Sequence, residues 1–322
     1  MATDITLSNG VRMPLFGLGT WQANEGEVAA ALRIALRNGY RSIDTATAYG
    51  NEKEIGDVLQ EFFRSGELKR EDVFVTTKLF WGNNRAEDVE PQLRNSLKLL
   101  QLEFVDLYLV HMPAGLTADL SQVDQKIDHQ SLWRAMERVY ELKLARDIGT
   151  SNWTAEQLER VQKTARVPIH NNQVECHLHF NQAALLEAQK RLNITMTAYA
   201  PLGSPGRSAV TFPGGKFGFY FQEGHTSPLA NPLVVELAAK HKKTPAQILL
   251  RHLIQRGIAV IPKSTNEKRL RENADIFDFS LSKEEVEKLN NVKQEPRVFK
   301  LDFMAGAKED PFADERQSQK AA

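Results

Sequence analysis

The chain has 322 residues, of which 42% are hydrophobic, and its 41 lysine and arginine residues balance its 41 aspartate and glutamate residues. This length allows a large buried core, and a formal net charge of zero gives no electrostatic reason to expect a nucleic acid or an anionic membrane as partner. The single cysteine, Cys176, excludes an internal disulfide framework and suits a reducing compartment. No apolar run approaches the roughly 20 residues that a membrane span needs, and the N-terminus lacks the pattern of a signal peptide. We therefore expect a cytoplasmic protein.

The chain opens with a predicted β-hairpin over residues 5–13 that turns at Asn9-Gly10, the strongest short hairpin signal. Thereafter short apolar segments, typical of buried parallel strands, alternate with amphipathic helical segments. The strand and helix pairs that we expect are 16–20 with 25–38, 41–44 with 51–64, 73–77 with 86–100, 105–110 with 130–142, 146–150 with 155–164, 172–174 with 182–191, 194–199 with 231–256, and 259–261 with 266–273.

Eight strand–helix units without a break in composition favour one closed (β/α)8 barrel, a TIM barrel, and hence a single α/β domain over residues 1–322. A doubly wound sheet is the alternative, which is weakened because Gly17-Leu18-Gly19 lacks the third glycine of a dinucleotide-binding motif. Three segments are longer than a barrel requires, and loops of this length are typical of binding loops or lids. They cover residues 112–129, 203–227 and 295–322.

Polar residues stand at the ends of successive predicted strands, where a barrel of this kind carries its active site. Buried strand ends have no structural need for so many polar groups, since each costs free energy if it is left unpaired. We therefore expect them to form one functional ring. They are Asp44, Lys78, His111, Ser151, Asn152, Gln173, Tyr199, Lys263 and Ser264.

Tyr49 lies on the loop after the strand at 41–44 and is suited to proton chemistry. A phenol with an ordinary pKa of about 10 is a weak acid at neutral pH unless a cation stands nearby. Lys78 is the candidate cation, and His111 could position a substrate oxygen. Each of these residues alone is more often a surface or packing residue, but their combination indicates a site.

Six motifs make the sequence recognisable. They are Gly17-Leu18-Gly19-Thr20-Trp21, Asp44-Thr45-Ala46-Thr47-Ala48-Tyr49-Gly50-Asn51-Glu52, Leu109-Val110-His111, Gly149-Thr150-Ser151-Asn152-Trp153, Tyr199-Ala200-Pro201-Leu202-Gly203-Ser204 and Ile261-Pro262-Lys263-Ser264. In this order and at this spacing the chain resembles the aldo-keto reductase family, in particular its aldose and aldehyde reductases. The resemblance runs from Gly17 to Pro311-Phe312, which is nearly the whole chain.

The resemblance implies a catalytic tetrad of Tyr49, Asp44, Lys78 and His111, and the NADPH-dependent reduction of aldehydes and some ketones to alcohols. In that mechanism Tyr49 gives a proton to the carbonyl oxygen as hydride arrives from the nicotinamide. Lys78, paired with Asp44, would lower the pKa of Tyr49 by placing a positive charge beside the phenolate. His111 would orient and polarise the carbonyl, and a histidine at this position argues against double-bond reduction, which in this family accompanies a glutamate there.

The rest of the ring is implied to bind NADPH. Ser151, Asn152 and Gln173 would bond the carboxamide, Tyr199 would stack on the nicotinamide, and Leu202 and Ser204 would contact the pyrophosphate. The full cofactor site implied by the resemblance is Thr20, Trp21, Asp44, Ser151, Asn152, Gln173, Tyr199, Leu202, Ser204, Lys263, Ser264, Thr265, Arg269 and Asn273.

Physical chemistry adds an independent argument for the adenosine end of this site. Lys263 and Arg269 flank the predicted helix start near Asn266. A helix N-terminus with two cations suits a dianion, which favours the 2′-phosphate of NADPH over NADH.

An apolar pocket is expected over the nicotinamide, and such a pocket suits aliphatic or aromatic aldehydes better than bulky polar substrates. The chain departs from the family at Met112, because a tryptophan commonly follows the histidine there. A flexible methionine would make the pocket wider or less selective. The expected pocket residues are Trp21, Phe80, Trp81, Met112, Val298 and Phe299.

We expect no metal site. The segment Cys176-His177-Leu178-His179 directs two histidines the same way along a strand, but zinc takes at least three protein ligands and no second ligand cluster accompanies it. We expect a small-molecule carbonyl substrate. We also expect a monomer, because no predicted helix offers an apolar stripe beyond the one that packs on the barrel. Two alternatives to an enzyme remain, a non-catalytic NADPH-binding regulator and a structural protein on the same barrel.

Overall fold

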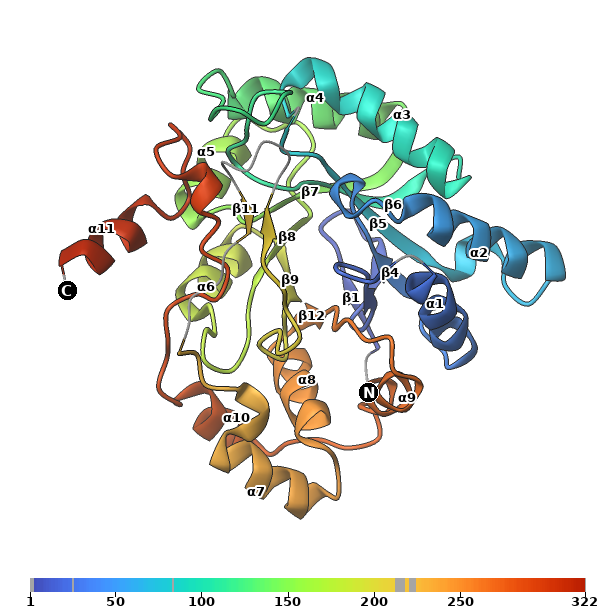
Figure 1. The fold of residues 1–322 in the computed structure, drawn as a ribbon, viewed down its shortest axis with the longest axis vertical. Helices are drawn as coiled ribbons and strands as arrows, with labels where there is room; N and C mark the ends of the chain where they lie inside the picture. Colours follow the sequence, from blue (N-terminus) through green and yellow to red (C-terminus); the bar gives the residue numbers. More distant parts are fainter. Residues whose placement is uncertain (1–2, 25, 83, 212–217, 220–223, 322) are drawn as a thin grey trace.

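The computed structural model describes residues 3–24, 26–82, 84–211, 218–219 and 224–321. Eight parallel strands form one sheet in the order β3-β4-β5-β6-β7-β8-β9-β12. An isolated parallel bridge between Phe16 and Val260 joins its two edges, and Val260 exchanges main-chain hydrogen bonds of 2.9 Å with Leu15 and Gly17. The sheet therefore closes into a barrel, with the helices arranged around it (Figure 1). The predicted (β/α)8 fold is confirmed.

The predicted elements recur with small shifts at their ends. The barrel strands are β3 (Leu18–Gly19), β4 (Ser42–Asp44), β5 (Phe74–Leu79), β6 (Val105–Val110), β7 (Ala145–Ser151), β8 (Asn171–Glu175), β9 (Thr195–Tyr199) and β12 (Ile258–Val260). The helices are α1 (Glu27–Arg37), α2 (Glu52–Ser65), α3 (Val89–Leu100), α4 (His129–Glu141), α5 (Ala155–Gln162), α6 (Ala183–Arg191), α7 (Pro232–His241), α8 (Pro245–Gln255), α9 (Glu267–Ala274), α10 (Lys283–Asn290) and α11 (Ala313–Ala321).

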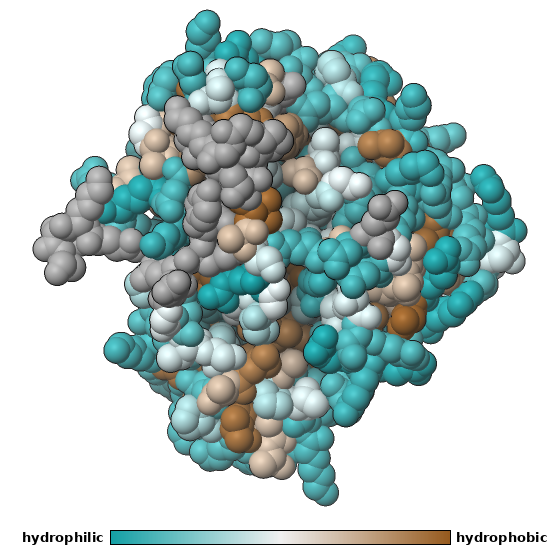
Figure 2. Space-filling model, in the orientation of Figure 1, coloured by the Kyte–Doolittle hydropathy of each residue, from teal (hydrophilic) through white to brown (hydrophobic). Residues whose placement is uncertain are grey.

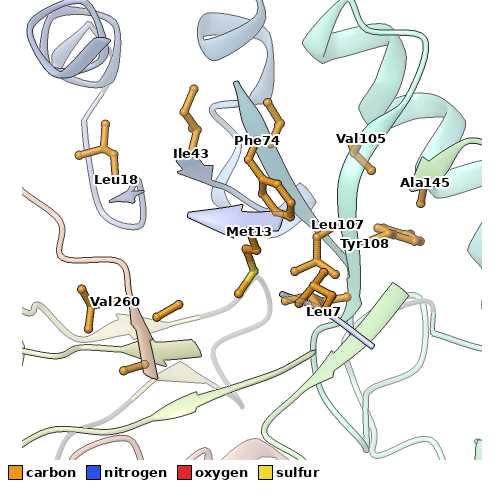
Figure 3. Close-up of a cluster of buried hydrophobic side chains, with 14 of the residues drawn as sticks. Leu7, Met13, Leu18, Ile43, Phe74, Val105, Leu107, Tyr108, Ala145 and Val260 are labelled. Atoms are coloured by element: carbon orange, nitrogen blue, oxygen red, sulfur yellow. The ribbon is translucent and has the colours of Figure 1, made fainter. Parts of the chain in front are cut away.

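The hairpin expected at 5–13 forms between β1 (Asp4–Thr6) and β2 (Arg12–Pro14). Leu7 follows β1, and Met13 lies in β2. Both belong to the same buried cluster as strand residues such as Ile43, as Figure 3 shows. The strands contribute apolar side chains to the barrel interior and to the layer under the helices, as expected of strands buried on both faces.

The single helix expected at 231–256 is wrong. The chain forms α7 and α8, which are separated at Lys242, a residue with a positive φ of 54°. Thr244 begins α8 with a capping box: its hydroxyl accepts from Gln247 N, while Gln247 Oε1 accepts from Thr244 N. Pro245 then occupies the first turn of α8. A proline is tolerated there because N–H groups of the first turn have no acceptor within the helix. The helices α10 and α11 were not expected from the sequence.

The three long segments lie outside the regular barrel. Residues 112–129 are held by a bridge between Leu116 and Val123. Of residues 203–227, β10 (Val210–Thr211) pairs with β11 (Gly218–Phe219), while 212–217 and 220–223 lie outside the described residues. Residues of the tail and of the loops pack together in a second buried cluster. It includes Trp81, Met112, Val298, Phe299, Leu301 and Phe303.

The face in Figure 2 is mainly hydrophilic, and its hydrophobic side chains lie in small groups. Among the residues whose burial is described, Val235 is the large hydrophobic residue that stands exposed to solvent. None of the helices that the structure describes combines the length and apolar character that crossing a membrane requires.

Candidate active site

The strand ends bring the predicted ring together. Asp44 ends β4, Lys78 lies near the end of β5, His111 follows β6, and Tyr199 ends β9. Because parallel strands of a barrel end at the same rim, these side chains converge there. A cavity of about 710 Å³ opens at this rim. All fourteen expected cofactor residues line it, together with Tyr49 and His111.

Lys78 stands behind the cavity wall. Its side chain is fully buried, and its Nζ lies 2.5 Å from Asp44 Oδ1, 2.9 Å from the main-chain oxygen of Thr45 and 3.3 Å from the Tyr49 hydroxyl. Asp44 and Tyr49 face the cavity instead. The cation therefore acts on any ligand through these two neighbours.

The turn that carries Tyr49 is fixed at both ends. Residues Thr47–Tyr49 form one turn of 3₁₀ helix, which ends at Gly50 with a φ of 69°, a conformation that favours glycine. The Thr47 hydroxyl lies 3.1 Å from the main-chain oxygen of Lys78, and the Asn51 amide donates to Thr20 O at 3.0 Å. The phenol is thus held over the end of β5.

Burial dominates the acid–base properties of the site. It raises the pKa of the Tyr49 phenol well above its ordinary value, and the negative charge of Asp44 raises that pKa further. The sequence-based expectation was a Tyr49 pKa lowered by Lys78, so burial acts in the opposite direction. Burial also lowers the pKa of Lys78, while the Asp44 carboxylate raises that pKa. Burial and the Lys78 cation lower the pKa of His111 well below its ordinary value.

Asn152 connects the residues expected around the carboxamide. Its Nδ2 donates to His111 O at 3.0 Å and to Met112 Sδ at 3.2 Å, and its Oδ1 accepts from the Tyr199 hydroxyl at 2.8 Å. Its φ of 65° lies in the left-handed region, which asparagine tolerates better than most residues. Gln173 Nε2 donates to Asp44 Oδ2 at 2.7 Å, so this amide also ties the ring to the tetrad.

The far end of the cavity is built by the segment after β12 and by α9. The residues expected around the adenosine end line it, namely Lys263, Ser264, Thr265, Arg269 and Asn273. The Asn266 side chain accepts from Arg269 N at 3.0 Å and caps the helix N-terminus.

The structure divides the six expected pocket residues. Trp21, Met112 and Phe299 line the cavity, and the Trp21 and Phe299 ring centroids lie 5.8 Å apart. Trp81 and Val298 are buried in the second cluster instead, where the Trp81 ring stands 5.0 Å from His111. Phe80 packs against that cluster, 4.9 Å from Trp81, and is not among the residues on the cavity wall.

The sequence does not predict several residues on the cavity wall, among them Leu301, Arg207 and Gln22. Leu301 adds to its apolar side and Arg207 adds a cation. The Gln22 amide donates to Ser208 O at 2.6 Å and accepts from Ser208 N at 3.1 Å, which fixes the segment after β9 across the cleft. No spacing in the sequence links positions 22 and 208, so only the fold could reveal this contact.

The two histidines after β8 have structural partners. His177 Nε2 lies 3.1 Å from Glu175 Oε1, and Glu175 also accepts from the main-chain nitrogens of Val298 and Phe299 at 2.6 and 3.0 Å. His179 Nδ1 lies 3.3 Å from Thr226 O. Within the described ranges, histidine, cysteine and acidic side chains nowhere gather as three or more in an arrangement that could hold a metal ion.

Comparisons with known proteins agree on one family. The model of the Aldo/keto reductase family matches residues 15–294. Aldo-keto reductase family 1 member A1 of Bos taurus is 40% identical over 306 residues, covering 92% of this chain and 91% of that protein. Aldo-keto reductase family 1 member C1 of Homo sapiens is 36% identical over 327 residues, covering 97% and 98%.

Solved structures give the same result. The aldose reductase from Schistosoma japonicum superposes with a TM-score of 0.87 at 38% identity, covering 97% of this chain and 99% of that one. An aldo-keto reductase crystallised in complex with NADPH superposes with a TM-score of 0.86 at 36% identity, covering 96% and 93%.

Proposed function

The chain belongs to the aldo/keto reductase family, and on this premise we propose that it reduces aldehydes, and some ketones, to alcohols with NADPH and with Tyr49 as the general acid. One observation supports this most strongly. The Lys78 ammonium lies within hydrogen-bonding distance of both the Asp44 carboxylate and the Tyr49 hydroxyl, and Tyr49 lines the cavity.

The residues of the cavity fit NADPH. The amides of Asn152 and Gln173, which suit a carboxamide, line the same cavity as Tyr49. The cations Lys263 and Arg269 lie at the N-terminal end of α9, where a dianionic 2′-phosphate would be favoured. The cofactor-bound state of a similar aldo-keto reductase supports the assignment. When bound, NADPH supplies the hydride for carbonyl reduction.

Tyr49 is suited to hold a proton until the reaction demands it. The raised pKa keeps the phenol protonated through the neutral pH range, so the proton is present whenever a substrate binds. A carbonyl oxygen that receives a hydride at its carbon becomes an alkoxide, a far stronger base than a phenolate, and takes this proton. Lys78 then faces a phenolate at hydrogen-bonding distance and stabilises it, while Asp44 holds Lys78 in place.

His111 is suited to orient the carbonyl as a neutral ring. Its lowered pKa keeps it uncharged, and its buried Nδ1 has no hydrogen-bond partner within the described structure. Because a buried N–H without a partner is rarer than an unpaired acceptor, we assign the ring proton to Nε2. That N–H can donate to a substrate oxygen and polarise it.

The cavity favours apolar carbonyl compounds. Trp21, Phe299 and Leu301 supply apolar surface beside the tetrad. Met112 is 3% exposed, and its sulfur accepts a hydrogen bond from Asn152. These contacts hold the side chain in place, so it widens the pocket less than a flexible methionine would. Aliphatic and aromatic aldehydes fit such walls best.

The test is the loss of NADPH absorbance with a panel of aldehydes, a hexose and a ketosteroid, repeated with NADH. We expect turnover of aldehydes with NADPH, and its loss in Tyr49→Phe, which removes the proton but keeps the ring. The variant should still bind NADPH, as measured by fluorescence. Full activity in Tyr49→Phe would remove this residue as the acid, and NADPH binding without turnover in the wild type would favour a regulatory or structural protein.

A further inference from the structure

A second buried carboxylate interacts with Lys78 and does not line the cavity, and the mechanism above does not use it. Glu52, the first residue of α2, is 2% exposed. Its Oε1 accepts from the Thr77 hydroxyl at 2.6 Å, and its Oε2 accepts from the Ser96 hydroxyl at 3.1 Å. A buried carboxylate is costly in free energy unless its interactions compensate for lost hydration.

The hydroxyl partners connect Glu52 to the backbone that carries the reacting groups. Thr77 directly precedes Lys78 in β5. Ser96 Oγ lies 3.1 Å from Thr47 Oγ1, and Thr47 in turn lies 3.1 Å from the main-chain oxygen of Lys78. Thr47 also begins the short helical turn that ends at Tyr49. One carboxylate thus restrains both sides of the Lys78–Tyr49 contact.

Glu52 also acts through its charge. Burial lowers the pKa of Lys78, and the charges of Asp44 and Glu52 both raise that pKa. Burial raises the pKa of Glu52, against the hydrogen bonds from Thr77 and Ser96 and the charge of Lys78. The buried Tyr108 phenol faces Glu52 from β6, and Tyr49 and His111 face Lys78 from the cavity side. Lys78 is the cation in this group.

We propose that Glu52 is a positioning residue that keeps Lys78 charged and holds the Lys78–Tyr49 contact, acting through Lys78 and through the hydroxyls of Thr77, Ser96 and Thr47. The inference rests on the proposed function, because it assigns Glu52 a part in the same proton transfer. Two carboxylates around one ammonium would then serve different ends: Asp44 faces the ligand cavity, and Glu52 sets the charge and place of the cation from within the protein.

The test compares Glu52→Gln, which keeps the size and removes the charge, with Glu52→Asp, which keeps the charge and shortens the reach. In Glu52→Gln we expect the alkaline limb of the kcat profile to move to lower pH by about one unit, which lowers kcat about tenfold on that limb. In Glu52→Asp the limb should stay at the wild-type pH while kcat falls at all pH values. NADPH affinity should stay within about twofold in both, since Glu52 does not line the cavity.

A matched control is Glu137→Gln. Glu137 is 1% exposed in α4 and accepts from the main-chain nitrogens of Arg166 and Val167 at 2.5 and 3.0 Å, away from the cavity. It should cost similar stability and leave the pH profile unchanged. If Glu52→Gln instead gives the wild-type profile, or if Glu52→Asp shifts the limb as Glu52→Gln does, the proposal is overturned.

Two further measurements cover other outcomes. Should Glu52→Gln not fold, Ser96→Ala breaks the route to Thr47 without removing a charge, and an unchanged kcat in that variant would overturn the positional part. Titration of the Lys78 Cε resonance by NMR in wild type and in Glu52→Asp and Glu52→Gln requires no substrate. It therefore reports on Glu52 even if the wild type reduces no carbonyl compound, which would refute the proposed function alone.

Discussion

At Tyr49, burial and a neighbouring cation act on the same hydroxyl in opposite senses. Burial keeps the phenol protonated, and Lys78, 3.3 Å away, would stabilise the phenolate that the proposed proton transfer leaves. A general acid needs both properties. It must keep its proton before the reaction, and the free-energy cost of losing that proton during the reaction must be low. A lysine on the cavity wall would bind anions directly, whereas a buried one acts only through Tyr49 and Asp44.

The ring of polar residues could be predicted because barrel topology converts strand ends into neighbours. What the sequence could not give was the direction of each side chain. Lys78 and Asp44 both lie at strand ends, yet only Asp44 reaches the cavity. Phe80, Trp81 and Val298 were expected in the pocket for their apolar character, but the tail packs against this region, and apolar side chains there can turn either way.

Lys263→Glu tests the adenosine end of the site at the residue scale. Replacing a cation beside the α9 N-terminus with an anion should weaken NADPH binding by at least about tenfold and leave NADH nearly unchanged, because only NADPH carries a 2′-phosphate. Dissociation constants measured by fluorescence titration give the ratio. Lys268→Glu is the matched control, since Lys268 lies on the same helix with an 84% exposed side chain. Equal losses for both cofactors in Lys263→Glu would refute the 2′-phosphate assignment.

At the scale of elements, periodicity found every barrel strand and most helices but joined α7 to α8. Apolar residues stand at helical spacing on both sides of residues 241–245, and the polar stretch between them is little more than one helical turn, so the apolar pattern alone does not mark an end. The signal for the break was Thr244, Pro245 and Gln247, a capping box with proline in the first turn. Ser282 and Glu285 form the same kind of box at the start of α10, which was also missed. Capping residues therefore carried information that periodicity did not.

Thr244→Ala tests whether this cap stabilises the molecule. The loss of the hydroxyl that accepts from Gln247 N should lower the free energy of unfolding by about 1 kcal/mol. Urea denaturation measures the change, and Thr244→Ser, which keeps a hydroxyl, should recover most of it. A loss in Thr244→Ser as large as that in Thr244→Ala would show that the methyl group, not the cap, matters here. Thr244 also lines the cavity, so NADPH affinity is measured alongside.

At the scale of the whole molecule, one hydrophobic cluster extends from Leu7 in the hairpin region to Ile276 after α9. The extent of this cluster accords with the single domain that the sequence analysis expects, which stays a prediction. The hairpin is joined to the barrel by a polar contact as well, since Asn9 Nδ2 donates to Asp147 Oδ1 at 2.8 Å.

Asp147 and His170 form a buried pair beside that contact. Their side chains are 0% and 1% exposed, with His170 Nδ1 at 3.2 Å from Asp147 Oδ1. Burial raises the pKa of Asp147 from 3.8 to about 7 and lowers the pKa of His170 from 6.5 to about 4. His170 Nδ1 also accepts from Ile148 N at 3.3 Å, which favours an unprotonated Nδ1 and a proton on the carboxyl group, even though Nε2 then has no partner within the described structure.

The stability of the wild type should therefore depend on pH through Asp147 in an unusual direction. Between pH 4 and 7 the folded chain holds a proton on Asp147 that the unfolded chain releases, so this contribution to stability is complete below pH 4 and is lost as pH rises to 7. His170 acts in the opposite direction between pH 4 and 6.5, because the unfolded chain binds its proton and the folded chain does not. The two effects largely cancel in the wild type and must be separated by mutation.

Asp147→Asn separates them, because asparagine keeps the shape and cannot titrate. Urea unfolding of both chains should show one transition at each pH, as expected of one domain. The stability of the wild type relative to the variant should fall by on the order of 2–4 kcal/mol from pH 4 to pH 7. Since His170 is present in both chains, its contribution largely drops out of this difference. Glu71→Gln, at an exposed position, should follow the wild type in parallel. Parallel curves for Asp147→Asn as well would mean that the folded chain does not hold an additional proton on Asp147 between pH 4 and 7, and would overturn this assignment.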